Sequence, residues 1–254
     1  MKYLIGVQPT GKLHIGNYLG CIKRGLEHQE AGHDVTFMIA NYHALTCVHD
    51  YKPSMLEAEL KRLGCKNIVY QTPEYTELFF KLCCKTGIGT LSKMPQYKSK
   101  SHLLGDATSD NTATANMGLL LYPVLMTADI IINDPDVVIV GRDQVAHIDL
   151  CNDLAKRVGV KRRFNYEFGH VEKVYSLIDP SRKMSKSDGD GHVIYLFDED
   201  YEKKLRRATA TEDGLRNLRT IATNVGVSVN PEMSNLELKE SMSRKMNELF
   251  NNGV

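Results

Sequence analysis

Residues 3–20 read YLIGVQPTGKLHIGNYLG and join a predicted strand to a predicted helix. The apolar run Tyr3–Gly6 is short and is followed by turn residues, which is typical of a buried strand. From Asn17 the chain meets no helix breaker before Gly25 and Gly32, so a helix is expected there. The crowded segment between strand and helix predicts a tight loop at a helix N-terminus. Free backbone N–H groups and the helix dipole favour an anion at such a loop, and a nucleotide phosphate is the first candidate.

Two motifs compete for this loop, and the first is a P-loop. Gly6, Gly11 and Lys12 have the spacing G-x-x-x-x-G-K. A P-loop needs Ser or Thr at the next position to hold Mg²⁺, whereas Leu13 has no hydroxyl. Pro9 also removes one N–H group from the expected phosphate cradle. A P-loop phosphotransferase is therefore disfavoured.

The second motif is HIGN at residues 14–17, which resembles the HIGH signature of class I aminoacyl-tRNA synthetases. Far along the chain, residues 183–187 read KMSKS, which matches the second signature of that class letter for letter. Each motif is predicted to lie next to the end of a strand. A four-residue match or a lysine-rich loop is weak by itself, but the two in this order favour a class I synthetase.

The composition is that of an ordinary globular protein. The chain has 254 residues, of which 42% are hydrophobic and 25% charged. No signal peptide is recognisable and no apolar run approaches the roughly eighteen residues of a membrane span, so we expect a cytoplasmic protein without membrane contact. The six cysteines form no CxxC pair, which predicts reduced thiols and no metal site. With a net charge of +1, any RNA contact must come from local patches.

Strand and helix patterns alternate along the first part of the chain. Further strands are predicted at Asp34–Ala40, Asn67–Tyr70 and Asp136–Gly141, and helices at Pro53–Leu63, Glu74–Lys85, Gly118–Ile132 and Ala146–Arg157. This order predicts an α/β fold with a doubly wound, Rossmann-like parallel sheet. Its ligand crevice is expected at the carboxyl ends of the strands.

Polar residues gather at the predicted strand ends. His14, Asn17, the run Asn41–His43 and the run Arg142–Gln144 should therefore line one crevice. His43 fits either a ligand contact or a capping or core histidine. Asp129 is the one charge in the apolar helix Gly118–Ile132. Burying a carboxylate without a partner costs several kcal/mol, so it is either paired in the core or accepts a bond from a ligand.

The segment Thr90–Met117 breaks the apolar rhythm and is rich in Ser, Thr and Asn. It predicts an extended loop with a mobile portion around Gly105–Asn116, and loops of this length commonly act as lids or binding arms. Lys98 and Lys100 near its start are either a solvated pair, or one of them reaches a nucleotide triphosphate.

The chain turns helical after the KMSKS motif, with helices expected at Asp198–Ala208, Asp213–Val225 and Asn235–Phe250. We expect a catalytic domain over residues 1–178 and, over residues 179–254, the KMSKS loop with a small C-terminal helical domain. The last helix is predicted to bury one apolar face, made of Leu236, Leu238, Met242, Met246, Leu249 and Phe250.

Several further runs look like those of the tryptophanyl-tRNA synthetase family, namely Gly6–Gly11, Tyr18–Gly20, His43–Thr46, Tyr122–Ile130 and Val140–His147. With the KMSKS motif they extend from residue 3 to about residue 188. The related tyrosyl enzymes share the fold and also place an aspartate near their substrate. Two features resemble the tryptophanyl rather than the tyrosyl enzymes, namely the opening GVQPTG and the run GRDQ followed by His147. The C-terminal helical part is curtailed beside typical members of the family.

The resemblance implies that a homodimer activates L-tryptophan with ATP and Mg²⁺ and transfers it to tRNA(Trp). By the family pattern His14 and Asn17 contact the phosphates, and Lys183 and Lys186 clamp the pyrophosphate with help from Lys100. The other nucleotide contacts carried over are Gln8, Thr10, Gly16, Gly141, Asp143, Gln144 and Met184. The tryptophan pocket carried over consists of Gln8, His43, Tyr122, Met126 and Gln144, with Asp129 accepting the indole N–H. No residues are assigned as metal ligands.

Two alternatives stay open beside the working synthetase. One is a synthetase-like regulatory protein that binds tryptophan or its adenylate but charges tRNA weakly, and the other is a tyrosine-specific class I enzyme. Two basic clusters are either tRNA phosphate contacts or solvated helix faces: Lys161, Arg162 and Arg163, and Lys203, Lys204, Arg206 and Arg207.

Overall fold

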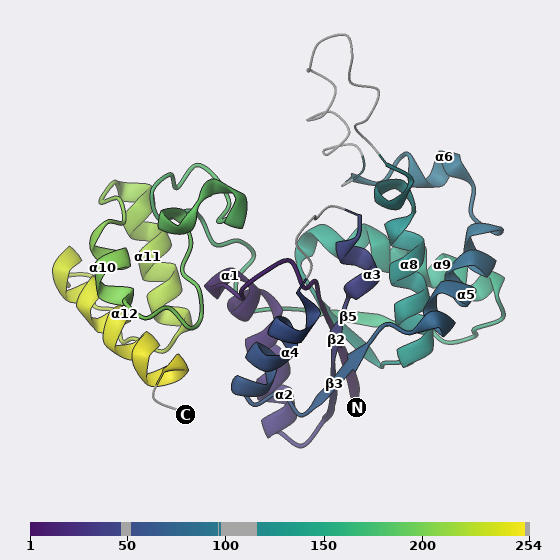
Figure 1. The fold of residues 1–254 in the computed structure, drawn as a ribbon, viewed down its shortest axis with the longest axis horizontal. Helices are drawn as coiled ribbons and strands as arrows, with labels where there is room; N and C mark the ends of the chain where they lie inside the picture. Colours follow the sequence, from purple (N-terminus) through teal and green to yellow (C-terminus); the bar gives the residue numbers. More distant parts are fainter. Residues whose placement is uncertain (47–51, 96, 98–115, 252–254) are drawn as a thin grey trace, which may run out of the picture.

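The computed structural model describes residues 1–46, 52–95, 97 and 116–251. Its centre is a sheet of five parallel strands in the order β3-β2-β1-β4-β5 (Figure 1). The strands are β1 (Lys2–Val7), β2 (Asp34–Ile39), β3 (Asn67–Tyr70), β4 (Val137–Val140) and β5 (Asn165–Phe168). The predicted doubly wound α/β fold is confirmed. Strand β5 was not predicted, because this edge strand is half exposed and has no apolar run.

Helices cover both faces of the sheet because alternate residues of each strand point to opposite sides. Ile5, Phe37 and Ile139 belong to one core cluster, whereas their neighbours Leu4 and Met38 belong to another. The helices beside the sheet are α2 (Lys23–Glu30), α3 (Asn41–Ala44), α4 (Pro53–Arg62), α5 (Pro73–Cys83), α8 (Met117–Asn133) and α9 (Val145–Arg157). The first cluster contains α4 residues, and the second contains residues of α8 and α9.

The predicted first helix is composite. It runs through α1 (Ile15–Asn17), the π-helical turn Tyr18–Ile22 and then α2. Gly25 does not break it but lies buried inside α2, where a Cβ atom would overlap the side chains of Ile5 and Phe37. The glycine therefore lets the helix approach the sheet closely, and the chain reverses only after Glu30, at Gly32 with φ +84°.

Helix α8 begins where the amide of Leu119 donates to the Asn116 side chain at 2.8 Å. Pro123 lies inside the helix, and the Thr127 hydroxyl donates to its carbonyl oxygen at 3.0 Å. The loop predicted from Thr90 starts later than expected, because Thr90 belongs to the short helix α6 (Ile88–Leu91). Lys98, Lys100 and the predicted mobile portion up to residue 115 lie outside the described residues.

The C-terminal helices lie side by side, on the left in Figure 1. They are α10 (Tyr201–Arg206), α11 (Glu212–Asn224) and α12 (Asn235–Phe250). Helix α12 buries Leu238, Met242, Met246 and Phe250 at a spacing of four residues. Leu236 and Leu249 were wrongly predicted on this face; they are 57% and 39% exposed. Both lie in the terminal turns of α12, where they fall outside the buried stripe.

The C-terminal part packs directly on the sheet part. Buried residues from both belong to one continuous apolar cluster. The Tyr18 ring meets the Phe250 ring edge-on at 5.1 Å, and the Arg62 guanidinium donates to the Phe250 carbonyl oxygen at 3.1 Å. The division at residues 178 and 179 stays a prediction. Among the described residues, no helix has both the length and the apolar character needed to cross a membrane.

Candidate active site

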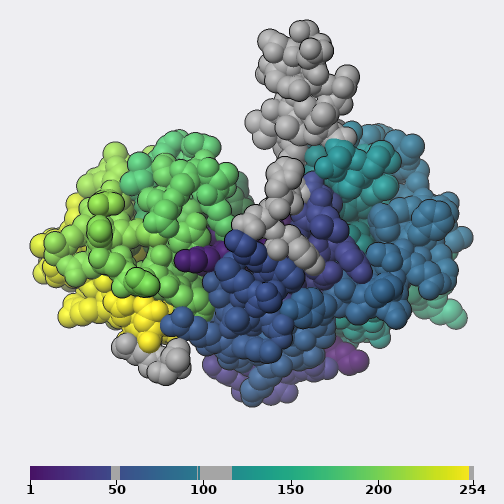
Figure 2. Space-filling view, viewed as in Figure 1, coloured from purple at the N-terminus to yellow at the C-terminus, as the bar shows by residue number. Residues whose placement is uncertain are grey.

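The loop after β1 is fixed at both of its ends. Gly11 adopts φ +101°, a left-handed conformation that favours glycine. The Leu196 amide donates to the Leu13 carbonyl oxygen at 3.0 Å, and the Ile15 amide donates to the Ile194 carbonyl oxygen at 2.9 Å. The loop is therefore held between the sheet and the segment that follows the KMSKS motif. Figure 2 shows purple atoms of the chain's start at the surface between the C-terminal part and the blue atoms around α4.

His14 begins α1 and is held by its own turn. Its Nδ1 accepts from the Gly16 amide at 3.1 Å, and its amide donates to the Asn17 Oδ1 at 3.2 Å. A Cβ atom at Gly16 would lie 2.9 Å from the His14 ring, so a larger residue there would displace the imidazole. These three predicted site residues therefore form one unit.

His14 is neutral at physiological pH. Burial, and then the nearby charges of Lys186 and Lys183, lower the pKa of this histidine to about 3. Because Nδ1 accepts the Gly16 N–H bond, the proton of the neutral ring is on Nε2. The ring can then donate to an anion without carrying a charge.

The KMSKS motif lies against the loop that immediately precedes the HIGN motif, and its two lysines interact electrostatically with His14. The Lys186 ammonium donates to the carbonyl oxygen of Gly11 at 3.0 Å and to that of Thr10 at 3.4 Å. Burial lowers the pKa of Lys186 to about 8, while the charge of Glu59 acts in the opposite direction. The ammonium is therefore charged at neutral pH and lies directly on the loop predicted to bind phosphate.

The remainder of the KMSKS motif divides between surface and core. The Lys183 side chain is exposed, whereas Met184 is 3% exposed and its amide donates to the Val174 carbonyl oxygen at 2.9 Å. The motif does not follow a strand as predicted. Lys183 forms only an isolated bridge with Tyr175, because the last strand, β5, ends at Phe168.

Strand β4 is followed by Gly141 and the short 3₁₀ turn Arg142–Gln144. The side-chain nitrogen of Gln144 donates to the Asp143 carboxylate at 2.7 Å, and the side-chain oxygen of Gln144 lies 2.9 Å from the Nδ1 of His147. The Tyr122 hydroxyl lies 3.0 Å from the other ring nitrogen, Nε2. An amide oxygen can only accept, so His147 carries a proton on Nδ1. Asp143 and Gln144, predicted to contact the nucleotide, are thus connected through His147 to Tyr122, which is predicted to line the tryptophan pocket.

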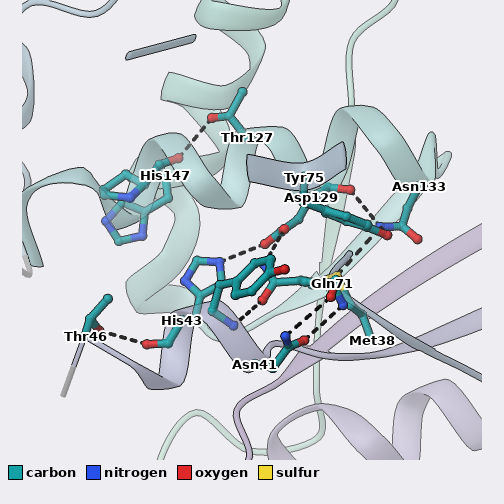
Figure 3. A network of polar contacts seen from close by, with 12 residues as sticks. Met38, Asn41, His43, Thr46, Gln71, Tyr75, Thr127, Asp129, Asn133 and His147 are labelled. Carbon is teal, nitrogen blue, oxygen red and sulfur yellow. Dashed lines mark hydrogen bonds and ion pairs between the residues drawn. The ribbon is translucent and has the colours of Figure 1, made fainter. Parts of the chain in front are cut away.

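Asp129 is buried in α8 and bonded through both carboxylate oxygens (Figure 3). The Nε2 of His43 lies 2.7 Å from one oxygen, and the Gln71 side-chain amide donates to the other at 2.6 Å. Of the two interpretations left open by the sequence, the structure shows pairing within the protein. Each carboxylate oxygen has a second acceptor position, so a ligand donor can be added. The indole contact stays a prediction.

Sequence analysis missed Gln71, which organises this network. Its side-chain oxygen accepts from the backbone amide of Tyr42 at 2.7 Å. Its backbone amide donates to the side-chain oxygen of Asn41 at 3.0 Å. The signal was present, because Gln71 directly follows β3 just as Asn41 and His43 lie just beyond the end of β2. His43 itself also meets the Tyr122 ring edge-on at 6.1 Å.

The remaining predicted pocket residues lie around these groups. Gln8 directly follows β1 and is exposed, and Met126 lies on α8 and packs against a buried cluster. Of the seven basic residues considered for tRNA, four form ion pairs with acidic residues, namely Arg162, Arg163, Lys204 and Arg206. The pairs of Arg163 and Arg206 are exposed, as is ordinary on solvated surfaces, whereas Lys204 is largely buried against Asp198. Contact with tRNA stays a prediction.

Comparisons with known proteins agree with this arrangement. The family model described as tRNA synthetases class I (W and Y) matches residues 1–252. The Tryptophan--tRNA ligase of Mycoplasma genitalium is 36% identical over 255 residues, which cover 87% of this chain and 72% of that protein. The crystal structure of tryptophanyl-tRNA synthetase from Mycoplasma pneumoniae matches with a TM-score of 0.81 and 29% identity, over 99% of this chain and 86% of that one.

A second solved structure was determined with ligands. The tryptophanyl-tRNA synthetase of Campylobacter jejuni, complexed with ADP and tryptophan, matches with a TM-score of 0.72 and 26% identity. The match covers 100% of this chain and 87% of that one. The chain thus belongs to the class I tRNA synthetases of the tryptophan and tyrosine family, and within it to the tryptophanyl-tRNA synthetases.

Proposed function

We propose that this chain activates L-tryptophan with ATP and passes the tryptophanyl group to tRNA(Trp). The observation that carries the proposal is the contact of Lys186 with the carbonyl oxygens of Thr10 and Gly11. It brings the charged KMSKS motif onto the loop after β1, directly before the HIGN motif, so that a cationic site lies there. Family membership and the tryptophan-specific relatives support the same reaction.

The first half-reaction is an attack by a tryptophan carboxylate oxygen on the α-phosphorus of ATP. The bond from the α-phosphorus to the bridging oxygen breaks, pyrophosphate leaves, and tryptophanyl-adenylate remains. No covalent bond to the enzyme is needed, so positioning and electrostatic stabilisation supply the catalysis. The neutral His14 donates from Nε2 to a phosphate oxygen, with Asn17 beside it, and the Lys183 and Lys186 ammonium groups hold the departing pyrophosphate.

The remaining nucleotide contacts follow from their places around this loop. Gln8, Thr10 and Gly16 belong to the loop and the first helical turn, and Gly141, Asp143 and Gln144 lie at the neighbouring end of β4. The strand order reverses between β1 and β4, and ligands of doubly wound sheets bind at such a point. Met184 is carried over as the neighbour of the adenine, and Lys100 as a further phosphate contact.

For the amino acid, we place the indole N–H on a free acceptor position of Asp129. The surrounding pocket is formed by Gln8, His43, Tyr122, Met126 and Gln144. His43 and Gln71 hold the carboxylate in one orientation, so it is preorganised for a donor. A site built to bond a donor rejects analogues that lack one by roughly 10⁴ or more in favourable cases. Phenylalanine should therefore be a poor substrate.

Mg²⁺ would arrive with the nucleotide. Within the described parts of the chain, no group of three or more His, Cys, Asp or Glu side chains could hold a metal ion. In proteins that bind nucleotides, Mg²⁺ is commonly held by one or two carboxylates together with the substrate phosphates. When bound, it would neutralise phosphate charge. From the same family assignment we also propose a homodimer and a cytoplasmic location. Analytical sedimentation of the purified chain tests the homodimer.

The direct test is ATP–pyrophosphate exchange with each amino acid supplied singly, followed by charging of bulk tRNA in the same preparation. Exchange with tryptophan alone, together with charging, is expected. Exchange without charging would favour a regulatory protein, and exchange with tyrosine would mean that the pocket was misassigned. No exchange with any amino acid would overturn the catalytic proposal.

A further inference from the structure

One carboxylate bonded to the loop after β1 belongs to neither signature motif. Glu59 lies on α4 and is half-buried. Its Oε2 accepts from the Leu13 amide at 2.7 Å, in the loop between Gly11 and His14. This carboxylate therefore fixes the loop at Leu13.

Positive charges surround the same carboxylate. Lys186, Lys12 and Arg62 all interact electrostatically with Glu59, and Lys12 and Arg62 line with it a cavity of about 240 Å³. Burial is the largest influence and raises the pKa of Glu59 above its usual value, although the Leu13 N–H bond and these three cations act to lower it. The ionised carboxylate accepts one direct hydrogen bond and lies among positive charges.

The Lys186 ammonium is half-buried and donates to two carbonyl oxygens. Burial lowers the pKa of Lys186, and the negative charge of Glu59 acts to raise it. Two other titratable groups near Lys186 are His14, which is neutral, and Lys183, which is a cation, and Lys12 and Arg62 add further positive charge around Glu59. Glu59 therefore supplies a negative charge in a cationic part of the described structure.

We propose that Glu59 is a positioning residue for adenylate formation, which fixes the phosphate loop through the Leu13 amide and holds charged Lys186 against the carbonyl oxygens of that loop. This inference rests on the proposed function for its catalytic consequence. It assigns Glu59 no contact with substrate. Its effect passes through Leu13 and Lys186 alone.

The test variant is Glu59→Gln, because the amide oxygen can still accept from Leu13 while the charge is lost. The matched control is Glu57→Gln on the same helix, since Glu57 instead binds Lys61 at 2.6 Å and the Tyr70 hydroxyl at 2.6 Å. Glu59→Gln should lower the tryptophan-dependent exchange rate by about tenfold at neutral pH, as expected when a reacting group is misplaced. The KM for tryptophan should change by less than about twofold.

The pH profile separates positioning from mere structural support. Removing the carboxylate charge lowers the pKa of Lys186, so the alkaline fall of the exchange rate should move to lower pH in Glu59→Gln and stay unchanged in Glu57→Gln. An unaltered rate or an unaltered alkaline limb in folded Glu59→Gln would overturn the proposal.

A second readout needs no activity. Acetylation of Lys186 by acetic anhydride, followed by mass spectrometry across a pH series, reports when this amine loses its proton. Its midpoint should fall in Glu59→Gln and not in Glu57→Gln. If the wild-type chain showed no exchange, the proposed function would fail, while the labelling would still decide the effect of Glu59 on Lys186. Equal midpoints in all three proteins would contradict it.

Discussion

At the nucleotide end of the site, Lys186 reaches two backbone carbonyl oxygens of a loop, whereas at the amino-acid end Asp129 is bonded by two buried side chains. The first end joins segments from the beginning and the last third of the chain and is partly open to solvent. The second lies between the sheet and helix α8, and His43 and Gln71 are buried with the carboxylate.

The difference assigns separate tasks to the two ends. A loop held by cations and carbonyl groups suits a triphosphate whose charge distribution changes during the reaction. A buried carboxylate that is held through both oxygens and keeps a free acceptor position suits the recognition of one fixed donor, because the protein has already oriented it. Substitutions at the first end should therefore reduce the rate, and substitutions at the second should reduce the binding of tryptophan.

The largest effect is expected at the nucleotide end. Lys186→Ala and Lys183→Ala should each slow adenylate formation by about 10²–10³, by analogy with the loss of one preorganised transition-state contact. Tryptophan binding should stay nearly intact. Single-turnover formation of the adenylate measures the rate, with Lys81→Ala on the exposed face of α5 as the control. Unchanged turnover in both variants would remove these lysines from the mechanism.

A smaller effect is expected at the amino-acid end. Asp129→Asn should weaken tryptophan binding by about 10–10², because hydrogen bonds to a charged group are worth roughly 1.5–3 kcal/mol. The new amide also places a donor opposite either His43 or Gln71, both of which now point at carboxylate oxygens. Isothermal titration measures the affinity, with the exposed Asp153→Asn as the control. Equal affinities would show that this carboxylate does not recognise the ligand.

The pH dependence sharpens the assignment of Lys186. With a pKa of about 8, this lysine is charged below that pH and neutral above it. The exchange rate should therefore fall by about tenfold between roughly pH 7 and pH 9 if the charged form is required. Lys186→Arg keeps its charge throughout this range, so any activity that it retains should lack the fall. A wild-type rate that stays flat through pH 9 would contradict the role of the ammonium.

The smallest effect is expected from Gln71→Ala. Removing one of the two bonds to Asp129 should weaken tryptophan binding by about fivefold, close to 1 kcal/mol. Gln29→Ala is the control, because Gln29 makes comparable amide bonds to Gly64 and Lys66 at the surface. A loss as large as that of Asp129→Asn would mean that Gln71 contacts the ligand itself.

The sequence predicted the parts of the molecule that depend on local pattern. Strands β1 to β4 follow apolar runs, and their bounds differ from the prediction by at most one residue at an end. The two signatures taken together led to the expectation that the KMSKS motif and the loop after β1 serve one site, and Lys186 contacts that loop. Leu236 and Leu249 were misplaced because a helical apolar pattern does not show where the neighbouring packing stops.

Partners that lie far apart in the chain could not be predicted from such patterns. Gln71 and Glu59 carry no motif, and their roles depend on which side chains the fold brings beside them. The same applies to the alternatives for Asp129, since only the folded chain shows His43 and Gln71 around it. Strand β5 escaped prediction because pairing with β4, rather than its own composition, makes it a strand.

One measurement tests the separation of the two ends most directly. The chain contains no tryptophan, so the fluorescence of added tryptophan reports its binding without background from the protein's own indole groups. Titrations of the wild-type chain, Lys186→Ala and Asp129→Asn should give dissociation constants that agree within about twofold for the first two and are at least about tenfold weaker for the third. Equal weakening in both variants, or unchanged binding in Asp129→Asn, would contradict the account.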